Sequence, residues 1–238
     1  MLVDLVAGQL SIDRIAVAIA DLPATLSGVK LVQMSDFHYD GAHLSERLLM
    51  EAIAASNQAK PDLVLLTGDF ISDNPAPIHQ LIKHLKHLQS RAGVFAVLGN
   101  HDICFPQTKR EVMTALTSIG IQVLWNEIAY PLGVDLPIVG LADLWSREFN
   151  PAPILYQLDP SIPRIILSHN PDTAALLQRW RGDLQLSGHT HGGQIYLPGI
   201  GPAPMLLTKL SQYIPQFLRP WIPFMNECDR VVRNWQWA

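Results

Sequence analysis

The sequence contains little cysteine and no pattern of cysteines that binds a metal ion. Cys104 and Cys228 are the two cysteines among 238 residues, and they lie far apart. A thiolate zinc site needs closely spaced cysteines, so that class of site is excluded. Two isolated cysteines are typical of free thiols in a reducing compartment, although a single disulfide between them stays open. Metal chemistry in this chain would have to come from histidine, carboxylate and amide side chains.

Long apolar runs and basic clusters are also missing. No run reaches the roughly 18 uninterrupted apolar residues of a membrane-spanning helix. Residues 1–20 contain Asp4 and Asp13 and lack the basic start and apolar middle of a signal peptide. The formal net charge of −4 argues against a nucleic-acid-binding surface, while a local basic pocket for a phosphate stays open. We therefore expect a cytoplasmic protein.

The C-terminal segment, residues 205–238, is rich in aromatic and apolar residues. Trp221, Trp235 and Trp237 lie there among Pro, Leu and Ile. Exposed aromatic side chains of this kind can rest on a partner or on a membrane surface, which would place the protein at the inner face of the membrane. The alternative is that these side chains pack against the core.

Apolar periodicity predicts strands that alternate with helices. Strands are predicted at residues 30–34, 63–66, 94–98, 121–125, 137–141, 164–167, 184–186 and 194–197. Helical stripes are predicted around residues 48–53, 78–88, 112–119 and 171–180, and residues 11–19 predict an edge strand or a hairpin arm. Alternating strands and helices favour parallel pairing, and the helix-poor second half indicates a second, more antiparallel sheet. The length is sufficient for one large α/β domain, residues 1–238.

Polar donor side chains follow five of these strands at the point where each strand ends. They are Asp36, His38, Asp69, Asn100, His101, Asp102, His169, His189 and His191. In open α/β sheets, ligands bind just past the carboxyl ends of the strands. Taken singly, Asp36-x-His38 and Gly68-Asp69 are weak signals, whereas Gly99-Asn100-His101-Asp102 and Gly188-His189-x-His191 are more specific. Packing does not explain all five strand ends. The other histidines are expected on the surface: His43, His79, His84 and His87.

The number and type of these donors favour two metal ions over one. A tetrahedral zinc site needs four protein ligands, whereas this set offers seven: Asp36, His38, Asp69, Asn100, His169, His189 and His191. Seven donors suit two ions that share a bridging carboxylate, for which Asp69 is the candidate. Imidazole, carboxylate and amide donors without thiolate suit Mn, Fe, Zn or Co. Two such ions can activate water and clamp the oxygens of a phosphoryl displacement.

Together, the five blocks resemble the signature of calcineurin-like metallophosphoesterases. The blocks are Asp36-x-His38, Gly68-Asp69, Gly99-Asn100-His101-Asp102, Ser168-His169 and Gly188-His189-x-His191. The resemblance covers residues 31–197, and the wording around the blocks is similar to a bacterial phosphodiesterase subgroup of that family. It implies a four-layer α/β/β/α sandwich of two mixed β-sheets flanked by helices.

The resemblance also implies roles for individual residues. It divides the ligands between two ions, the first held by Asp36, His38, Asp69 and His191, and the second by Asp69, Asn100, His169 and His189. His101 would sit beside the phosphate, where it stabilises charge in the transition state or protonates the leaving oxygen. Asp102 would hold the His101 ring. Asp143 lies in a loop that the subgroup places near the site, and we assign it no direct role.

The implied activity is hydrolysis of a phosphodiester bond. A phosphomonoesterase on the same site and a catalytically silent metal-binding scaffold are the alternatives, and the complete ligand set with His101 argues against the scaffold. The expected substrates are a phosphate-ester small molecule or a lipid-linked phosphate. Members of the subgroup often begin with a membrane-spanning helix and continue beyond the region that matches residues 231–237. We therefore expect a chain that lacks its C-terminal closing segment.

Overall fold

The structure is a computed structural model that describes residues 10–41, 44–72, 74–191, 196–197 and 201–202. The chain divides into two compact units, Met1–His189 and Thr190–Ala238. In the second unit, β9 (Tyr196–Leu197) pairs antiparallel with β10 (Gly201–Pro202). The tryptophan-rich segment at residues 205–238 and Cys228 lie outside the described residues. The described part contains no helix that is long and apolar enough to span a bilayer.

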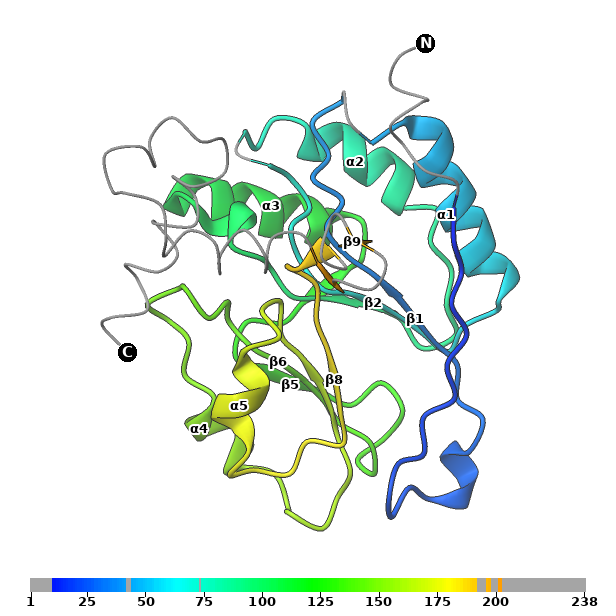
Figure 1. Cartoon of the computed structure of the whole chain (residues 1–238), viewed down its shortest axis with the longest axis vertical. Helices are drawn as coiled ribbons and strands as arrows, with labels where there is room; N and C mark the ends of the chain where they lie inside the picture. The colour runs from blue at the N-terminus through cyan, green and yellow to red at the C-terminus, as the bar shows by residue number, and fades with distance from the viewer. Residues whose placement is uncertain (1–9, 42–43, 73, 192–195, 198–200, 203–238) are drawn as a thin grey trace. The chain divides into compact units, whose positions relative to one another are not determined.

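Four parallel strands form the first sheet of the larger unit (Figure 1). In spatial order they are β1 (Leu31–Met34), β2 (Leu63–Leu66), β3 (Val94–Ala96) and β4 (Gln122–Val123). Each of the first three strands leads into a helix, and these helices are α1 (Glu46–Gln58), α2 (Ile78–Leu85) and α3 (Pro106–Ser118). Parallel neighbours need such crossovers, because a tight turn cannot bring the chain back to the same end of the sheet.

The second sheet of this unit is mixed. Its strands, in spatial order, are β5 (Glu127–Ala129), β6 (Ile138–Gly140), β7 (Ile165–Leu167) and β8 (Leu184–Leu186). β5 is antiparallel to β6, and the other pairs are parallel. Two short helices follow β6 and β7: α4 (Ala152–Leu155) and α5 (Thr173–Leu177). The second sheet is therefore helix-poor, as the sequence indicates, but its described antiparallel pairing is limited to β5.

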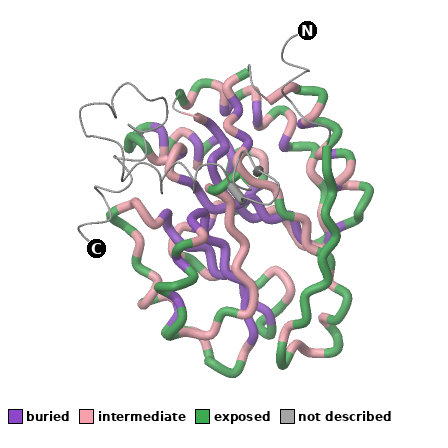
Figure 2. The backbone as a smooth tube through the Cα atoms, viewed as in Figure 1, coloured by how far each residue is buried: buried purple, intermediate pink, exposed green. Residues whose placement is uncertain are grey.

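Alternating residues of the strands face two different apolar cores. Val64 and Leu66 of β2 pack with residues of α1, α2 and α3, whereas Leu63 and Leu65 pack with the second sheet. On the other side of the second sheet, Val139 packs with residues of α4 and α5. This period of two follows from the pleat, and the buried residues run along the strands in Figure 2. The predicted four-layer α/β/β/α order is confirmed.

Local signals in the sequence agree with the helices better than with the first predicted strand. Ser45 is of a residue type that commonly caps helices, and it caps α1: its Oγ accepts a hydrogen bond from the Leu48 N–H at 3.3 Å. The edge strand predicted at residues 11–19 is wrong: these residues have no strand structure and are mostly exposed. Within the described part of the chain no strand pairs with them, so their backbone lacks the ladder that a strand requires.

Candidate metal centre

The loops that follow β1, β2, β3, β7 and β8 carry the candidate ligands, and the backbone there is unusually strained. Eight described residues other than glycine have a positive φ. Five of them are candidate ligands, namely Asp36 (54°), His38 (39°), Asp69 (54°), His189 (69°) and His191 (49°). Side chains make this left-handed region unfavourable, so structures retain it where the surrounding fold or a function requires it. The strain therefore coincides with the set of donors found in the sequence.

One group of ligand atoms comes from the loops after β1 and β2. Donor atoms of Asp36, His38 and Asp69 all lie within 4.8 Å of one another. His38 Nε2 is 3.5 Å from Asp69 Oδ2. The backbone N–H of His189 donates to both oxygens of Asp36, at 2.8 and 3.1 Å, and this fixes the carboxylate at the end of β8. These three residues could hold one cation through two carboxylates and one imidazole.

A second group shares Asp69 with the first. Donor atoms of Asp69, His169 and His189 lie within 4.8 Å of one another, and His169 Nε2 is 3.1 Å from Asp69 Oδ2. The amide oxygen of Asn100 lies between the two imidazoles, 3.2 Å from His169 Nε2 and 2.9 Å from His189 Nδ1. Six of the seven predicted ligands thus belong to two groups joined at one carboxylate. The seventh, His191, lies in the second unit, and its role as a ligand stays a prediction.

Neighbouring backbone groups orient these side chains. The Thr67 carbonyl lies 2.7 Å from His169 Nδ1, so Nδ1 carries the proton in the neutral ring and Nε2 is available to a cation. Asp69 Oδ1 accepts a hydrogen bond from the His101 N–H at 2.9 Å, and its other oxygen faces the two histidines. A cation placed there would meet donors whose positions are already set.

Burial and the close pairing of charged groups act on the pKa values of the residues in this centre. Burial by itself would lower the pKa of His169, but the hydrogen bond and charge of Asp69 outweigh it and raise the pKa to about 9. Burial would also raise the pKa of Asp69, and the contact with His169 reverses that shift and lowers it. Burial lowers the pKa of His189, and the positive charge of His169 adds to this effect. The centre therefore holds an ionised carboxylate where it would meet a cation.

Two glycines allow the loops to approach this closely. A Cβ on Gly68, whose φ is +99°, would lie 2.5 Å from the Gly99 nitrogen and 2.7 Å from His169 Nδ1. A Cβ on Gly99 would collide with Asp69 Oδ1 and lie 2.7 Å from His169 Cε1. The glycines in the Gly68-Asp69 and Gly99-Asn100 blocks are therefore explained by steric fit around Asp69 and His169.

His101 lies beside this centre, but Asp102 does not hold its ring. The His101 ring packs edge-on against His38 with 4.7 Å between centroids, and its Nδ1 lies 2.9 Å from the Ser72 carbonyl. Asp102 is fully buried, and its oxygens accept hydrogen bonds from the backbone N–H groups of Phe70, Ile71 and Gly99. The expectation that Asp102 orients His101 is corrected. The Ser72 carbonyl orients the ring, while Asp102 joins the loops after β2 and β3.

Because its role is to join these loops, Asp102 should matter first for stability. Burial, reinforced by the charge of Asp69, raises the pKa of Asp102 to about 7, and the backbone donors oppose this. In Asp102→Asn, an amide NH₂ would replace one of the carboxylate oxygens. The backbone N–H that donates to this oxygen in the wild type would then face another donor and lose its hydrogen bond. We expect a loss of about 2–3 kcal/mol in the free energy of unfolding, measured by urea titration. The control Asp13→Asn, on the exposed segment, should change it by less than about 0.5 kcal/mol. Equal stability of both variants would contradict the joining role.

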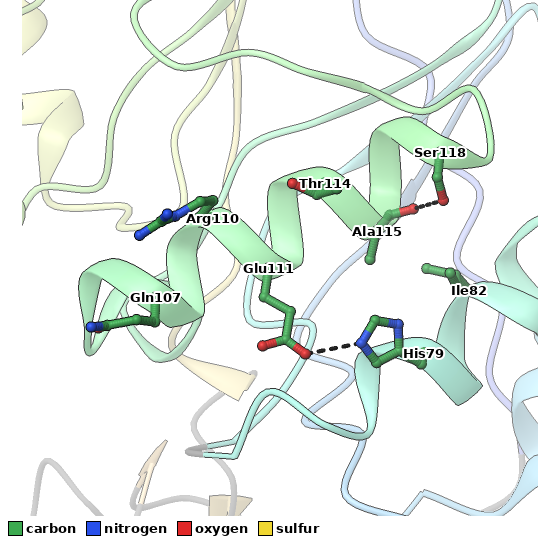
Figure 3. Close-up of a pocket in the computed structure, with 8 residues that line it drawn as sticks. All are labelled: His79, Ile82, Gln107, Arg110, Glu111, Thr114, Ala115 and Ser118. Carbon is green, nitrogen blue, oxygen red and sulfur yellow. Dashed lines mark hydrogen bonds and ion pairs between the residues drawn. The ribbon is translucent and has the colours of Figure 1, made fainter.

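Of the four histidines expected on the surface, the three that the structure describes belong to neither ligand group. His79 and His87 are exposed, His84 is half-buried, and His43 lies outside the described residues. His79 pairs with Glu111 at 2.9 Å in a hollow of about 430 Å³ between α2 and α3 (Figure 3). This hollow contains none of the candidate ligands, and an exposed ion pair of this kind contributes little to stability.

Comparison with known proteins identifies the family. Residues 29–193 match the family model of the calcineurin-like phosphoesterases. The chain belongs to the calcineurin-like phosphoesterase family. The resemblance carried by the five blocks is thereby confirmed, and the Asp and His groups of the centre fit the divalent metal ions that this family uses. Among the described residues no thiolate belongs to either group, and oxygen and imidazole donors suit several first-row metals.

Two relatives and one solved structure illustrate the similarity. The chain is 36% identical to phosphodiesterase YaeI of Escherichia coli (strain K12) over 72% of this chain and 64% of that protein. It is 31% identical to UDP-2,3-diacylglucosamine pyrophosphatase LpxG of Chlamydia trachomatis over 89% of this chain and 78% of that protein. TT1561 of Thermus thermophilus is 14% identical, with a TM-score of 0.50 over 67% of this chain and 81% of that one, and supports the fold alone.

Proposed function

We propose that this calcineurin-like phosphoesterase hydrolyses phosphodiester bonds with two metal ions. The observation that supports this best is the position of Asp69, whose carboxylate belongs to both groups of ligand atoms. A carboxylate shared in this way would keep two cations close together, as in-line phosphoryl displacement by two metals requires. When bound, the ions would supply a Lewis acid for the phosphate oxygens and an activated water as nucleophile.

The residues of the chain would divide the remaining work. We assign Asp36, His38, Asp69 and His191 to one ion and Asp69, Asn100, His169 and His189 to the other. The Ser72 carbonyl accepts a hydrogen bond from His101 Nδ1, so the reactive proton of a protonated ring would lie on Nε2. From there His101 would donate it to the leaving oxygen. Asp102 would act through the backbone of both loops and would not touch the substrate.

The substrate that we propose is a phosphate carrying two organic groups. The names of the two relatives, a phosphodiesterase and a UDP-diacylglucosamine pyrophosphatase, both describe cleavage at a phosphate that links two larger parts. A lipid-linked phosphate is therefore included in the proposal, and so is contact with the membrane surface during turnover. Mn, Fe, Zn and Co are the candidate metals.

A direct assay tests this proposal. The purified chain, stripped of metal and reloaded separately with Mn, Zn, Fe or Co, is given bis-p-nitrophenyl phosphate and p-nitrophenyl phosphate. We expect the metal to restore turnover, with the diester hydrolysed faster. A preference for the monoester would overturn the substrate class and keep the metal chemistry. A folded chain that binds two ions and hydrolyses neither ester would favour the scaffold function.

A further inference from the structure

The loop at residues 141–148, between β6 and α4, carries an aromatic side chain against a candidate ligand. Trp145 is half-buried, and its ring packs edge-on against the His189 ring with 4.7 Å between centroids. An indole contributes a large apolar surface, and its faces pack well against planar groups. Neither a metal ligand nor a proton donor is needed at this position, so the proposed chemistry leaves Trp145 without a role.

Side-chain hydrogen bonds hold the backbone of this loop in place. The Asn126 side chain bridges both ends of the loop: its Oδ1 accepts from the Ala142 N–H at 3.1 Å, and its Nδ2 donates to the Glu148 carbonyl at 2.7 Å. The Trp145 N–H donates to Asp143 Oδ1 at 2.9 Å. These bonds fix the backbone on both sides of Trp145.

Glu148 ties the same loop to α3. Its carboxylate accepts from Lys109 Nζ at 2.7 and 2.8 Å and from Trp125 Nε1 at 2.6 Å. Lys109 also lies 3.9 Å above the Trp125 ring. The hydrogen bond from Lys109 lowers the pKa of Glu148 most, and the hydrogen bond from Trp125 lowers it further, so the carboxylate stays charged. Hydrogen bonds hold this loop at both ends and at the Glu148 carboxylate, and they would keep Trp145 in one orientation.

We propose that Trp145 is a specificity-determining residue that contacts the organic group retained on the phosphate. This inference rests on the proposed function, because it takes the ligand groups as the place of reaction. His101, the proposed donor to the leaving oxygen, contacts His38 in the first group, whereas Trp145 contacts His189 in the second. The retained group is therefore the part of the substrate that Trp145 meets, and a flat aromatic group fits an indole best.

Two substrates with the same leaving group test the inference. Bis-p-nitrophenyl phosphate and methyl p-nitrophenyl phosphate both release p-nitrophenolate, but the retained group is an aryl in the first and a methyl in the second. We expect Trp145→Ala to lower the ratio of their kcat/KM values about fivefold to tenfold, mainly through a higher KM for the diaryl ester. Trp145→Phe should keep most of the ratio. Asn126→Asp, which loses the bond to the Glu148 carbonyl, should lower it less than Trp145→Ala does.

The controls separate a failure of this inference from a failure of the proposed function. The Trp180 ring packs with Tyr156, so Trp180→Phe should keep the wild-type ratio of kcat/KM values. Trp145→Ala should bind as much metal as the wild type. An unchanged ratio in an active Trp145→Ala enzyme would overturn the inference and leave the function standing. If the wild type hydrolyses neither ester, quenching of indole fluorescence by bis-p-nitrophenyl phosphate decides. Saturable quenching that is lost in Trp145→Phe supports the contact, and equal quenching refutes it.

Discussion

Asp69→Asn should abolish turnover, with kcat/KM for bis-p-nitrophenyl phosphate at least about 10³-fold below the wild type. Asp69 is 1% exposed and its carboxylate belongs to both groups of ligand atoms, so a single substitution weakens both proposed ion sites. The amide keeps the shape and one oxygen, but it removes the negative charge that would face two cations. The change therefore tests charge and bridging at nearly constant volume.

Metal content gives this experiment a readout that does not depend on activity. Wild-type protein should retain about two ions per chain after reloading, and Asp69→Asn should retain one or none. Added metal should raise the melting temperature of the wild type and have much less effect on the variant. Asp135→Asn, at an exposed carboxylate, is the matched control and should behave as the wild type. Two tightly bound ions in Asp69→Asn would contradict the bridging role.

The strands of the fold could be predicted because burial imposes a simple pattern on them, whereas the order of the four layers came from the family resemblance. The apolar run at residues 63–66 reads directly as a buried strand, and every residue of β2 is buried. The segment at residues 11–19 shows the limit of this reasoning. Its apolar and polar residues alternate as in a strand, but a strand also needs a second strand to pair with. Local sequence does not show where a pairing strand lies.

The candidate ligands could be named from the sequence because their chemistry is carried by side-chain identity and by position after a strand. The groups that orient them could not. Thr67 and Ser72 act through backbone carbonyls, which every residue possesses, so the sequence contains no signal for them. The family resemblance implies that Asp102 holds the His101 ring. In the structure its carboxylate turns to three backbone N–H groups instead.

Trp145 could not be singled out from the sequence either, because the contact that draws attention to it is long-range. A single aromatic residue in a loop has no spacing or motif, and its importance depends on contact with His189, 44 positions away in the sequence. The positive φ values at the candidate ligands were equally hidden, because Asp and His adopt a left-handed backbone more often than most residues but still do so at only a minority of positions. Strain and long-range contact are properties of the folded chain, and both are concentrated at this centre.

His101→Ala should lower kcat without removing metal, and the size of the loss should depend on the leaving group. p-Nitrophenolate leaves readily without a proton, whereas an alkoxide does not. If His101 Nε2 donates the proton, the loss should be about tenfold or less for bis-p-nitrophenyl phosphate and about 10²–10⁴-fold for a dialkyl phosphate. If His101 stabilises charge on the phosphate, both esters should lose a similar factor of about 10²–10³.

The fixed ring of His101 makes this comparison clean. Its Nδ1 lies 2.9 Å from the Ser72 carbonyl, so Nε2 is the nitrogen that the proposal assigns to the substrate. Metal content should match the wild type, because His101 is outside both ligand groups. His87→Ala, at an exposed histidine just beyond the C-terminal end of α2, should leave both rates unchanged. A similar loss for both esters would assign His101 to charge stabilisation, and wild-type rates for both would remove it from the reaction altogether.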